Sequence, residues 1–109
     1  MLYTIGDAAK ELGIPASTLR YYDKEGLLPH TSRSGSGIRM FTEDDFEWVR
    51  FIERLKISGM PIKEIKSYID LYEQGDATLP QRRELIRARR EAVERELERL
   101  QETLQFVAY

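Results

Sequence analysis

The sequence predicts a mainly α-helical fold, in which a small helical body carries one β-hairpin and is followed by a long helix. Three observations predict this fold class. Two short helical segments are separated by the turn Gly13-Ile14-Pro15, a Ser/Gly-rich stretch marks a hairpin tip, and apolar residues repeat every seven positions toward the C-terminus. We therefore expect two units, a body over residues 1–76 and a helix over residues 77–109.

The first two helices are delimited by local signals. Thr4 and Asp7 have the spacing of a helix cap, and Gly13 ends the first helix. Pro15 suits the start of a second helix, which Gly26 ends. Two short helices joined by so tight a turn form a helix-turn-helix.

The next segment predicts a β-hairpin. Leu27-Leu28-Pro29 leaves the second helix in extended form, and Ser34-Gly35-Ser36-Gly37 is typical of a hairpin tip. Ile38-Arg39-Met40-Phe41 alternates apolar and polar side chains, as a short returning strand does. A helix-turn-helix followed by such a hairpin is a winged helix-turn-helix.

Two further helices complete the body. Thr42 and the acidic residues after it mark the clearest helix start in the chain, because a hydroxyl caps the helix and acids complement its dipole. This helix ends at Ser58-Gly59, and Pro61 begins another helix that Gly75 closes. The expected buried stripe of the latter comprises Ile62, Ile65, Tyr68, Ile69 and Tyr72.

A long helix is expected to follow. Thr78-Leu79-Pro80-Gln81 has the pattern of a capping box, and neither Gly nor Pro interrupts the chain from there to about Gln105. At 1.5 Å per residue such a helix is about 40 Å long, too long for the body to cover, so its apolar stripe needs a partner. We assign six of its residues to a dimer interface: Ile86, Val93, Leu97, Leu100, Leu104 and Val107.

The net charge of −2 hides an uneven distribution. Residues 1–41 hold five Lys/Arg and four Asp/Glu, residues 42–79 hold five and nine, and residues 80–109 hold seven and six. The acid is therefore concentrated in the middle third. A nucleic-acid partner responds to the local field on one face of a protein, so the overall charge does not exclude one.

Several classes of function are disfavoured by what the 109 residues contain. The sequence has no cysteine and therefore offers no thiol chemistry. Its one histidine, His30, cannot form a histidine cluster for a metal, and we assign it to the surface. No apolar run is long enough to span a bilayer and no secretion signal is evident, so we expect a cytoplasmic protein without a membrane partner or cofactor. An enzyme is disfavoured, because no glycine-rich phosphate loop and no carboxylate pair in an apolar setting is evident.

Two blocks of the chain resemble the mercury-resistance-regulator (MerR) family of bacterial transcription factors. They are Leu19-Arg20-Tyr21-Tyr22-Asp23 with the following Gly26-Leu27-Leu28, and Arg33 with the following Gly37-Ile38-Arg39-Met40-Phe41. Residues 58–66 resemble the family's second wing and the helix after it, and the last helix resembles its dimerisation helix. The resemblance covers essentially the whole chain.

The resemblance implies a homodimer, joined by an antiparallel coiled coil, that binds a pseudo-palindromic promoter operator. It also implies that the dimer bends and underwinds the DNA between promoter elements, so that RNA polymerase can start. Metal, redox and aldehyde responders of this family use cysteine, which is absent here. Multidrug responders carry a large C-terminal ligand domain, for which we expect no room in these 109 residues.

One face of the second helix is a candidate DNA surface. Leu19 and Tyr22 share one face, and we assign Tyr22 to the core. The opposite face combines hydroxyls, cations and a phenol, which suits a major groove. The candidates on this face are Ser17, Thr18, Arg20, Tyr21 and Lys24.

Three further cations are candidates for phosphate contacts. Arg33 and Arg39 flank the hairpin tip, where small residues let the backbone approach DNA closely. Lys63 lies in the first turn of the fourth helix, where free N–H groups also favour a phosphate. For each of these residues the alternative is a solvated surface position.

Two other functions remain open at this stage. One is a DNA-architectural or recombination accessory protein with the same winged fold. The long dimer helix of this chain argues against that alternative. The other is a coiled-coil interaction module that has lost DNA binding. If a ligand binds, the candidates are aromatic residues of paired protomers, for which packing is the alternative role: Tyr68, Tyr72, Phe106 and Tyr109.

Overall fold

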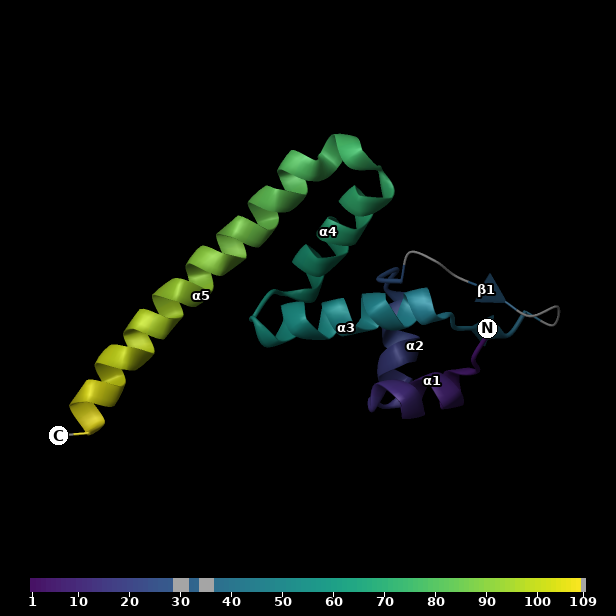
Figure 1. The fold of residues 1–109 in the computed structure, drawn as a ribbon, viewed down its shortest axis with the longest axis horizontal. Helices are drawn as coiled ribbons and strands as arrows, with labels where there is room; N and C mark the ends of the chain where they lie inside the picture. The colour runs from purple at the N-terminus through teal and green to yellow at the C-terminus, as the bar shows by residue number, and fades with distance from the viewer. Residues whose placement is uncertain (29–31, 34–36, 109) are drawn as a thin grey trace.

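A computed structural model describes residues 1–28, 37–108 and, for the backbone alone, residues 32 and 33. In it a body of short helices carries one long helical rod (Figure 1). Its elements are α1 (Ile5–Leu12), α2 (Ala16–Lys24), β1 (Ser32–Arg33), β2 (Arg39–Met40), α3 (Glu43–Ile57), α4 (Ile62–Glu73), the 3-10 helix η1 (Asp76–Thr78) and α5 (Leu79–Val107). This is the mainly α-helical winged fold that the sequence predicts.

The predicted starts of α1 and α3 are confirmed by their caps. The Thr4 hydroxyl accepts a hydrogen bond from the Asp7 N–H (3.2 Å), and Gly13 ends α1 with a left-handed φ of 69°. At α3 the capping is reciprocal, since the Thr42 hydroxyl accepts from the Asp45 N–H (3.2 Å) and the Asp45 carboxylate accepts from the Thr42 N–H (2.9 Å). Both starts are therefore fixed by residues next to them in the sequence.

The predicted hairpin is present as a short antiparallel pair. Arg33 of β1 lies opposite Arg39 of β2. Tyr3 and Phe41 exchange two backbone hydrogen bonds of 2.8 Å each, which attach the N-terminal segment to the base of the hairpin. The Ser/Gly tip at residues 34–36, like His30, lies outside the described residues.

One hydrophobic core joins α2, α3, α4 and the base of the hairpin. Its fully buried side chains include Leu19, Tyr22, Phe41, Ile52, Ile65 and Ile69. Burial of one such apolar side chain contributes about 1.5–3 kcal/mol to folding. The assignment of Tyr22 to the core is confirmed, and Ile65 and Ile69 form the buried stripe of α4, whereas Tyr72 of the predicted stripe is 40% exposed.

The predicted capping box at Thr78 is wrong. Thr78 precedes α5 but makes no side-chain cap. The turn η1 directs its hydroxyl oxygen back to the end of α4, where it lies 2.6 Å from the Leu71 carbonyl oxygen and accepts a 3.0 Å hydrogen bond from Arg82 Nε. The hydroxyl therefore fastens α4 to α5 instead of capping α5.

Helix α5 packs against the body only over its first half. Arg82 is buried, and Leu85, Arg89 and Ala92 are half-buried on the same side of the helix. Beyond residue 93 the helix leaves the body (Figure 1). Its side chains over residues 94–108 are exposed. Within the part of the chain that the structure describes, no helix is both long enough and apolar enough to cross a membrane.

Candidate DNA interface

Helix α2 presents its predicted polar face to solvent. Arg20 and Lys24 are exposed, Tyr21 is 43% exposed, and Leu19 and Tyr22 on the opposite face have no accessible surface. Ser17 is exposed as well, and Thr18 is half-buried. The helix is thus anchored by its apolar face while its hydroxyls and cations are free to meet a ligand.

The Tyr22 hydroxyl fixes α2 to α3. It donates a 2.9 Å hydrogen bond to Glu53 Oε1 and accepts one of 2.9 Å from Lys56 Nζ. Burial, as the largest cause, raises the pKa of Tyr22, and the hydrogen bond to Tyr22 raises the pKa of Lys56. The sequence pattern placed Tyr22 in the core but gave no sign of these two partners, which lie more than 30 residues away in the sequence.

Arg39 has a different environment from the one that a phosphate clamp requires. Its side chain is 9% exposed and its guanidinium pairs with Asp23 (3.0 Å) and the buried Asp45 (3.5 Å). The guanidinium also lies 4.3 Å from the centre of the Phe41 ring. Arg39 therefore joins β2 to α2 and α3, and sequence reasoning missed this role because neither carboxylate is near it in the sequence.

Helix α2 and the β1–β2 hairpin, which we call the wing, border a hollow of about 330 Å³. Two exposed cations of α2, Arg20 and Lys24, line it together with Ile38, which follows the hairpin tip. The hollow is lined by Ile5, Arg20, Asp23, Lys24, Ile38, Arg39 and Phe41. The structure thus brings three of the predicted DNA-contact residues together around one hollow: Arg20, Lys24 and Arg39.

Two predicted phosphate contacts remain, Lys63 and Arg33. Lys63 is exposed in the first turn of α4, as expected. A second lysine of α4, Lys66, lies one turn further on and pairs with Asp70 (3.2 Å). Its Nζ would lie 3.2 Å from a Cβ added at Gly26, so it sits over the end of α2. The side chain of Arg33 lies outside the description.

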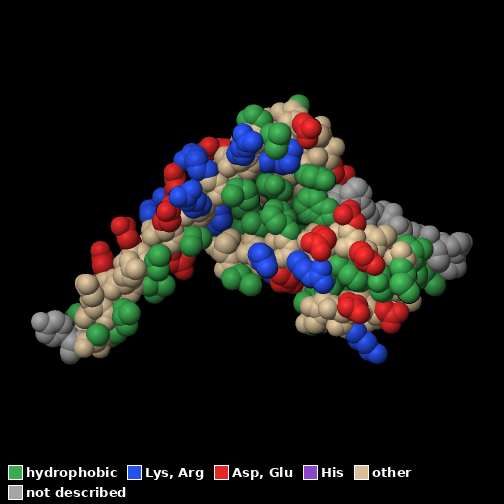
Figure 2. Space-filling view, viewed as in Figure 1, with side chains coloured by type: hydrophobic (Ala, Val, Ile, Leu, Met, Phe, Trp, Pro, Cys, Tyr) green, Lys and Arg blue, Asp and Glu red, His purple; other side chains and the backbone are tan. Residues whose placement is uncertain are grey.

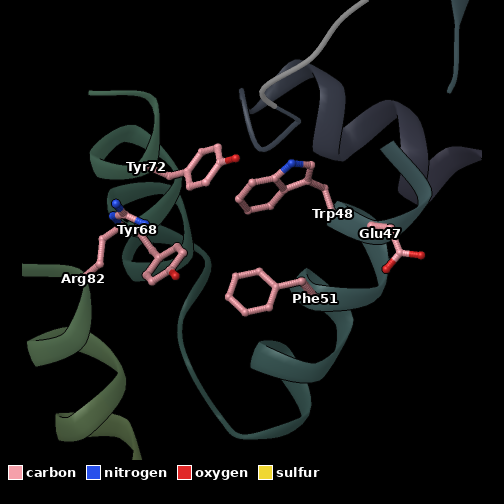
Figure 3. Close-up of a pocket in the computed structure, with 6 residues that line it drawn as sticks. All are labelled: Glu47, Trp48, Phe51, Tyr68, Tyr72 and Arg82. Atoms are coloured by element: carbon pink, nitrogen blue, oxygen red, sulfur yellow. The ribbon is translucent and has the colours of Figure 1, made fainter. Parts of the chain in front are cut away.

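A second cluster of side chains forms an aromatic cavity away from the recognition helix. Trp48 and Phe51 of α3 face Tyr68 and Tyr72 of α4 across a cavity of about 250 Å³ (Figure 3). The ring centres of Trp48 and Tyr72 are 4.6 Å apart, those of Phe51 and Tyr68 are 5.3 Å apart, and Arg82 lies over Tyr72. Hydrophobic side chains gather on this face beside the first half of α5 (Figure 2).

Sequence reasoning named Tyr68 and Tyr72 but missed Trp48 and Phe51. The available signal was their helical spacing, three residues apart on α3 and four residues apart on α4, which places each pair on one face. The described residues contain no group of His, Asp or Glu side chains arranged to hold a metal ion.

Two short helices joined by a tight turn, with a β-hairpin beside the second one, define the class of winged helix-turn-helix DNA-binding proteins. Residues 3–71 match the sequence model described as "MerR HTH family regulatory protein", and residues 46–107 match the model described as "MerR, DNA binding". The chain belongs to the MerR family of helix-turn-helix transcriptional regulators.

Relatives and a solved structure agree with this membership. An uncharacterized HTH-type transcriptional regulator of Haemophilus influenzae is 38% identical over 109 residues, which cover all of this chain and 81% of the relative. The regulator AdhR of Bacillus subtilis is 38% identical over 75% of this chain, but only 59% of AdhR is covered. The crystal structure of HiNmlR, described as a MerR family regulator lacking the sensor domain and bound to promoter DNA, superposes with a TM-score of 0.90 at 38% identity, covering all of this chain and 86% of HiNmlR.

Proposed function

We propose that this chain binds a pseudo-palindromic promoter operator as a homodimer and controls transcription by bending and underwinding the DNA. The observation that carries the proposal is the exposed polar face of α2, held in place by the buried Leu19 and Tyr22 beside the wing. The relative bound to promoter DNA supports the same partner. The proposal includes RNA polymerase as a partner at the promoter, a cytoplasmic location, and the division into a DNA-binding unit (residues 1–76) and a dimerisation helix (residues 77–109).

The side chains of α2 supply the chemistry that DNA recognition needs. Arg20 can donate two parallel hydrogen bonds to a guanine edge or hold a phosphate, and Lys24 can neutralise a phosphate. The hydroxyls of Ser17, Thr18 and Tyr21 can donate to phosphate oxygens or bases. For Arg39 we propose a positioning role, since its guanidinium is already engaged with two carboxylates and an aromatic ring.

The seam of α5 supports dimerisation. Leu97, Leu100, Leu104 and Val107 are between 54% and 67% exposed and follow one another at coiled-coil spacing. A contiguous stripe of exposed apolar side chains on one long helix is typical of an association surface. A second α5 would cover it.

The charge of α5 supports an antiparallel pair. Its first half, residues 79–90, holds five Arg and one Glu, whereas residues 91–107 hold five Glu and two Arg. A parallel pair would set like charges beside one another, while an antiparallel pair sets the basic half of each helix beside the acidic half of the other. The sign of the charge therefore favours the orientation that the family resemblance implies.

One experiment tests the proposal directly. Purified protein is incubated with fragmented genomic DNA from the source organism, and the fragments that it retains are sequenced. We expect enrichment of promoter fragments sharing one inverted repeat, and in vitro transcription from such a promoter should change when the protein is added. Retained DNA with unchanged transcription would favour the architectural alternative, and a dimer that retains no duplex would favour the interaction module.

A further inference from the structure

Phe106 is an apolar side chain that the dimer seam does not use. It is 81% exposed near the end of α5. The seam positions next to it are Leu104 and Val107, and the ring of Phe106 points to a different side of the helix. A large aromatic side chain gains free energy when a partner surface covers it.

The heptad position of Phe106 tells which way it points in a dimer. It lies two heptads after Ala92, and Ala92 belongs to the side of α5 that packs on the chain's own body. In an antiparallel pair related by a two-fold axis, equivalent flanks of the two helices face the same side of the pair. The partner's Phe106 therefore points toward this chain's body, at the end where α5 begins.

Charge selects one register of the antiparallel pair. In one register Ile86 meets the partner's Leu97, and Leu79 meets the partner's Leu104. Arg89 then lies opposite the partner's Glu96, and Arg87 lies opposite the partner's Glu94. A shift of one heptad, which pairs Ile86 with the partner's Leu104, sets both glutamates against their own copies instead. Like charges directly opposite are unfavourable, so the first register is favoured.

The surroundings of Arg89 agree with this register. Arg89 Nε is buried and has no hydrogen-bond partner among the described residues, and the nearest carboxylate of its own chain, that of Glu64, lies 3.7 Å from Nη2. A buried guanidinium N–H left without an acceptor is unfavourable. The carboxylate of the partner's Glu96 would arrive on the same flank of the helix.

The surface beside α5 has room for the incoming helix end. A groove of about 310 Å³ is lined by Tyr68 of α4 and by residues of the first half of α5 that include Leu79, Ile86 and Arg90. It shares the lining residues Tyr68 and Arg82 with the aromatic cavity, so the two spaces adjoin. In the favoured register the partner's Phe106 reaches the turn before α5, beside Tyr72 and Arg82.

We propose that a second copy of this chain completes the aromatic cavity by inserting its Phe106 between Trp48, Phe51, Tyr68 and Tyr72. The inference rests on the proposed homodimer and deepens it. It links the end of each dimer helix to α3 and α4 of the other protomer, and α3 carries the partners of Tyr22 that hold the recognition helix.

Trp48 provides the first test, because it is the only tryptophan of the chain. At a concentration where sedimentation shows dimers, Phe106→Ala should shift the Trp48 emission to the red and increase its quenching by acrylamide. Gln105→Ala, an exposed neighbour off the seam, is the matched control and should leave both unchanged. Both side chains are exposed in the single chain, so neither variant should unfold it.

The absence of cysteine allows a second test, of the register. Ile86→Cys combined with Leu97→Cys should give a covalent dimer under mild oxidation, whereas Ile86→Cys combined with Leu104→Cys should not. Within one helix either pair is too far apart to form a disulfide. Two results would overturn the inference while the homodimer stands: cross-linking of the second pair alone, or a Trp48 emission that is unchanged in dimeric Phe106→Ala. A wild-type chain that sediments as a monomer would overturn both the inference and the homodimer.

Discussion

The side chains of α2 divide into those that hold the helix and those that meet its ligand. Tyr22 and Leu19 have no accessible surface, whereas Arg20 and Lys24, one or two positions away, are exposed. Substitutions at the two kinds of position should therefore have separable effects, one on the free energy of unfolding and the other on the affinity for DNA.

Arg20→Ala should weaken operator binding without changing the fold. Loss of a bidentate contact to a guanine costs about 1–3 kcal/mol of binding free energy. Fluorescence anisotropy with a labelled operator measures this loss. The control is Arg50→Ala on α3, which removes an exposed cation that pairs with Glu47 (3.2 Å). Equal affinities for the two variants would remove Arg20 from the DNA contacts.

Tyr22→Phe should make the stability less dependent on alkaline pH. The pKa of Tyr22 is raised above its ordinary value of 10.0, mainly by burial. A raised pKa in the folded state adds stability that is complete below the unfolded-state pKa and is lost as the pH rises through the folded-state pKa. The unfolding free energy of the wild type should therefore fall as the pH rises above 10.0, and fall less in the variant.

Urea denaturation on both sides of that pH checks this difference. At neutral pH the variant should lose about 1 kcal/mol of stability, because Glu53 and Lys56 lose a hydrogen-bond partner but remain partly accessible to water. Tyr21→Phe, which leaves the buried hydroxyl in place, serves as the control. Parallel pH profiles for the wild type and Tyr22→Phe would contradict the expectation.

At the scale of elements, the sequence predicted what depends on neighbouring residues and missed what depends on distant ones. The starts of α1 and α3 follow from caps between residues three positions apart. The exposed polar face of α2 follows from the periodicity of its apolar side chains. Thr78 has the same local pattern but its hydroxyl is engaged by Leu71 and Arg82. Helical spacing could have placed each aromatic pair of the cavity on one face of its helix. Which faces meet, and which carboxylates surround Arg39, depends on how separate elements pack, and no local pattern indicates that.

Arg39→Ala should loosen the wing and destabilise the body. The substitution leaves the fully buried Asp45 carboxylate without its cation, and breaking a buried ion pair in this way costs about 3–5 kcal/mol. Thermal unfolding measures the loss. Arg39→Lys keeps the charge but not the planar fork, so a smaller loss is expected; a stability equal to that of the wild type would show that the pair is dispensable.

Leu97→Asp should convert the dimer to a monomer. It places a charge in the centre of the proposed seam, where no partner neutralises it. Sedimentation equilibrium measures the change, and Gln105→Asp adds the same charge off the seam as the control. A dimeric Leu97→Asp would mean that the seam lies on another face of α5.

At the scale of the whole molecule, the distribution of charge matters more than its sum. The acidic segment, residues 42–79, coincides with α3, α4 and η1, while the proposed DNA face lies on α2 and the wing. The proposed dimer would double that face and present two copies of α2 to one duplex. The acidic remainder of the surface should weaken nonspecific attachment to DNA, because it repels phosphates.

Operator affinity should therefore depend steeply on salt, and about twice as steeply for the dimer as for one protomer. Each phosphate contact contributes about 0.9 to the slope of log K against log salt, so about 4–6 contacts per protomer give the dimer a slope between about −7 and −11. Anisotropy titrations from dilute to physiological salt measure it. Monomeric Leu97→Asp on a half-site should show about half that slope, because it neutralises half as many phosphates. A flat response in the wild type would mean that the local basic face does not meet the DNA backbone. Equal slopes for the dimer and the monomer would mean that only one α2 helix of the pair contacts the DNA.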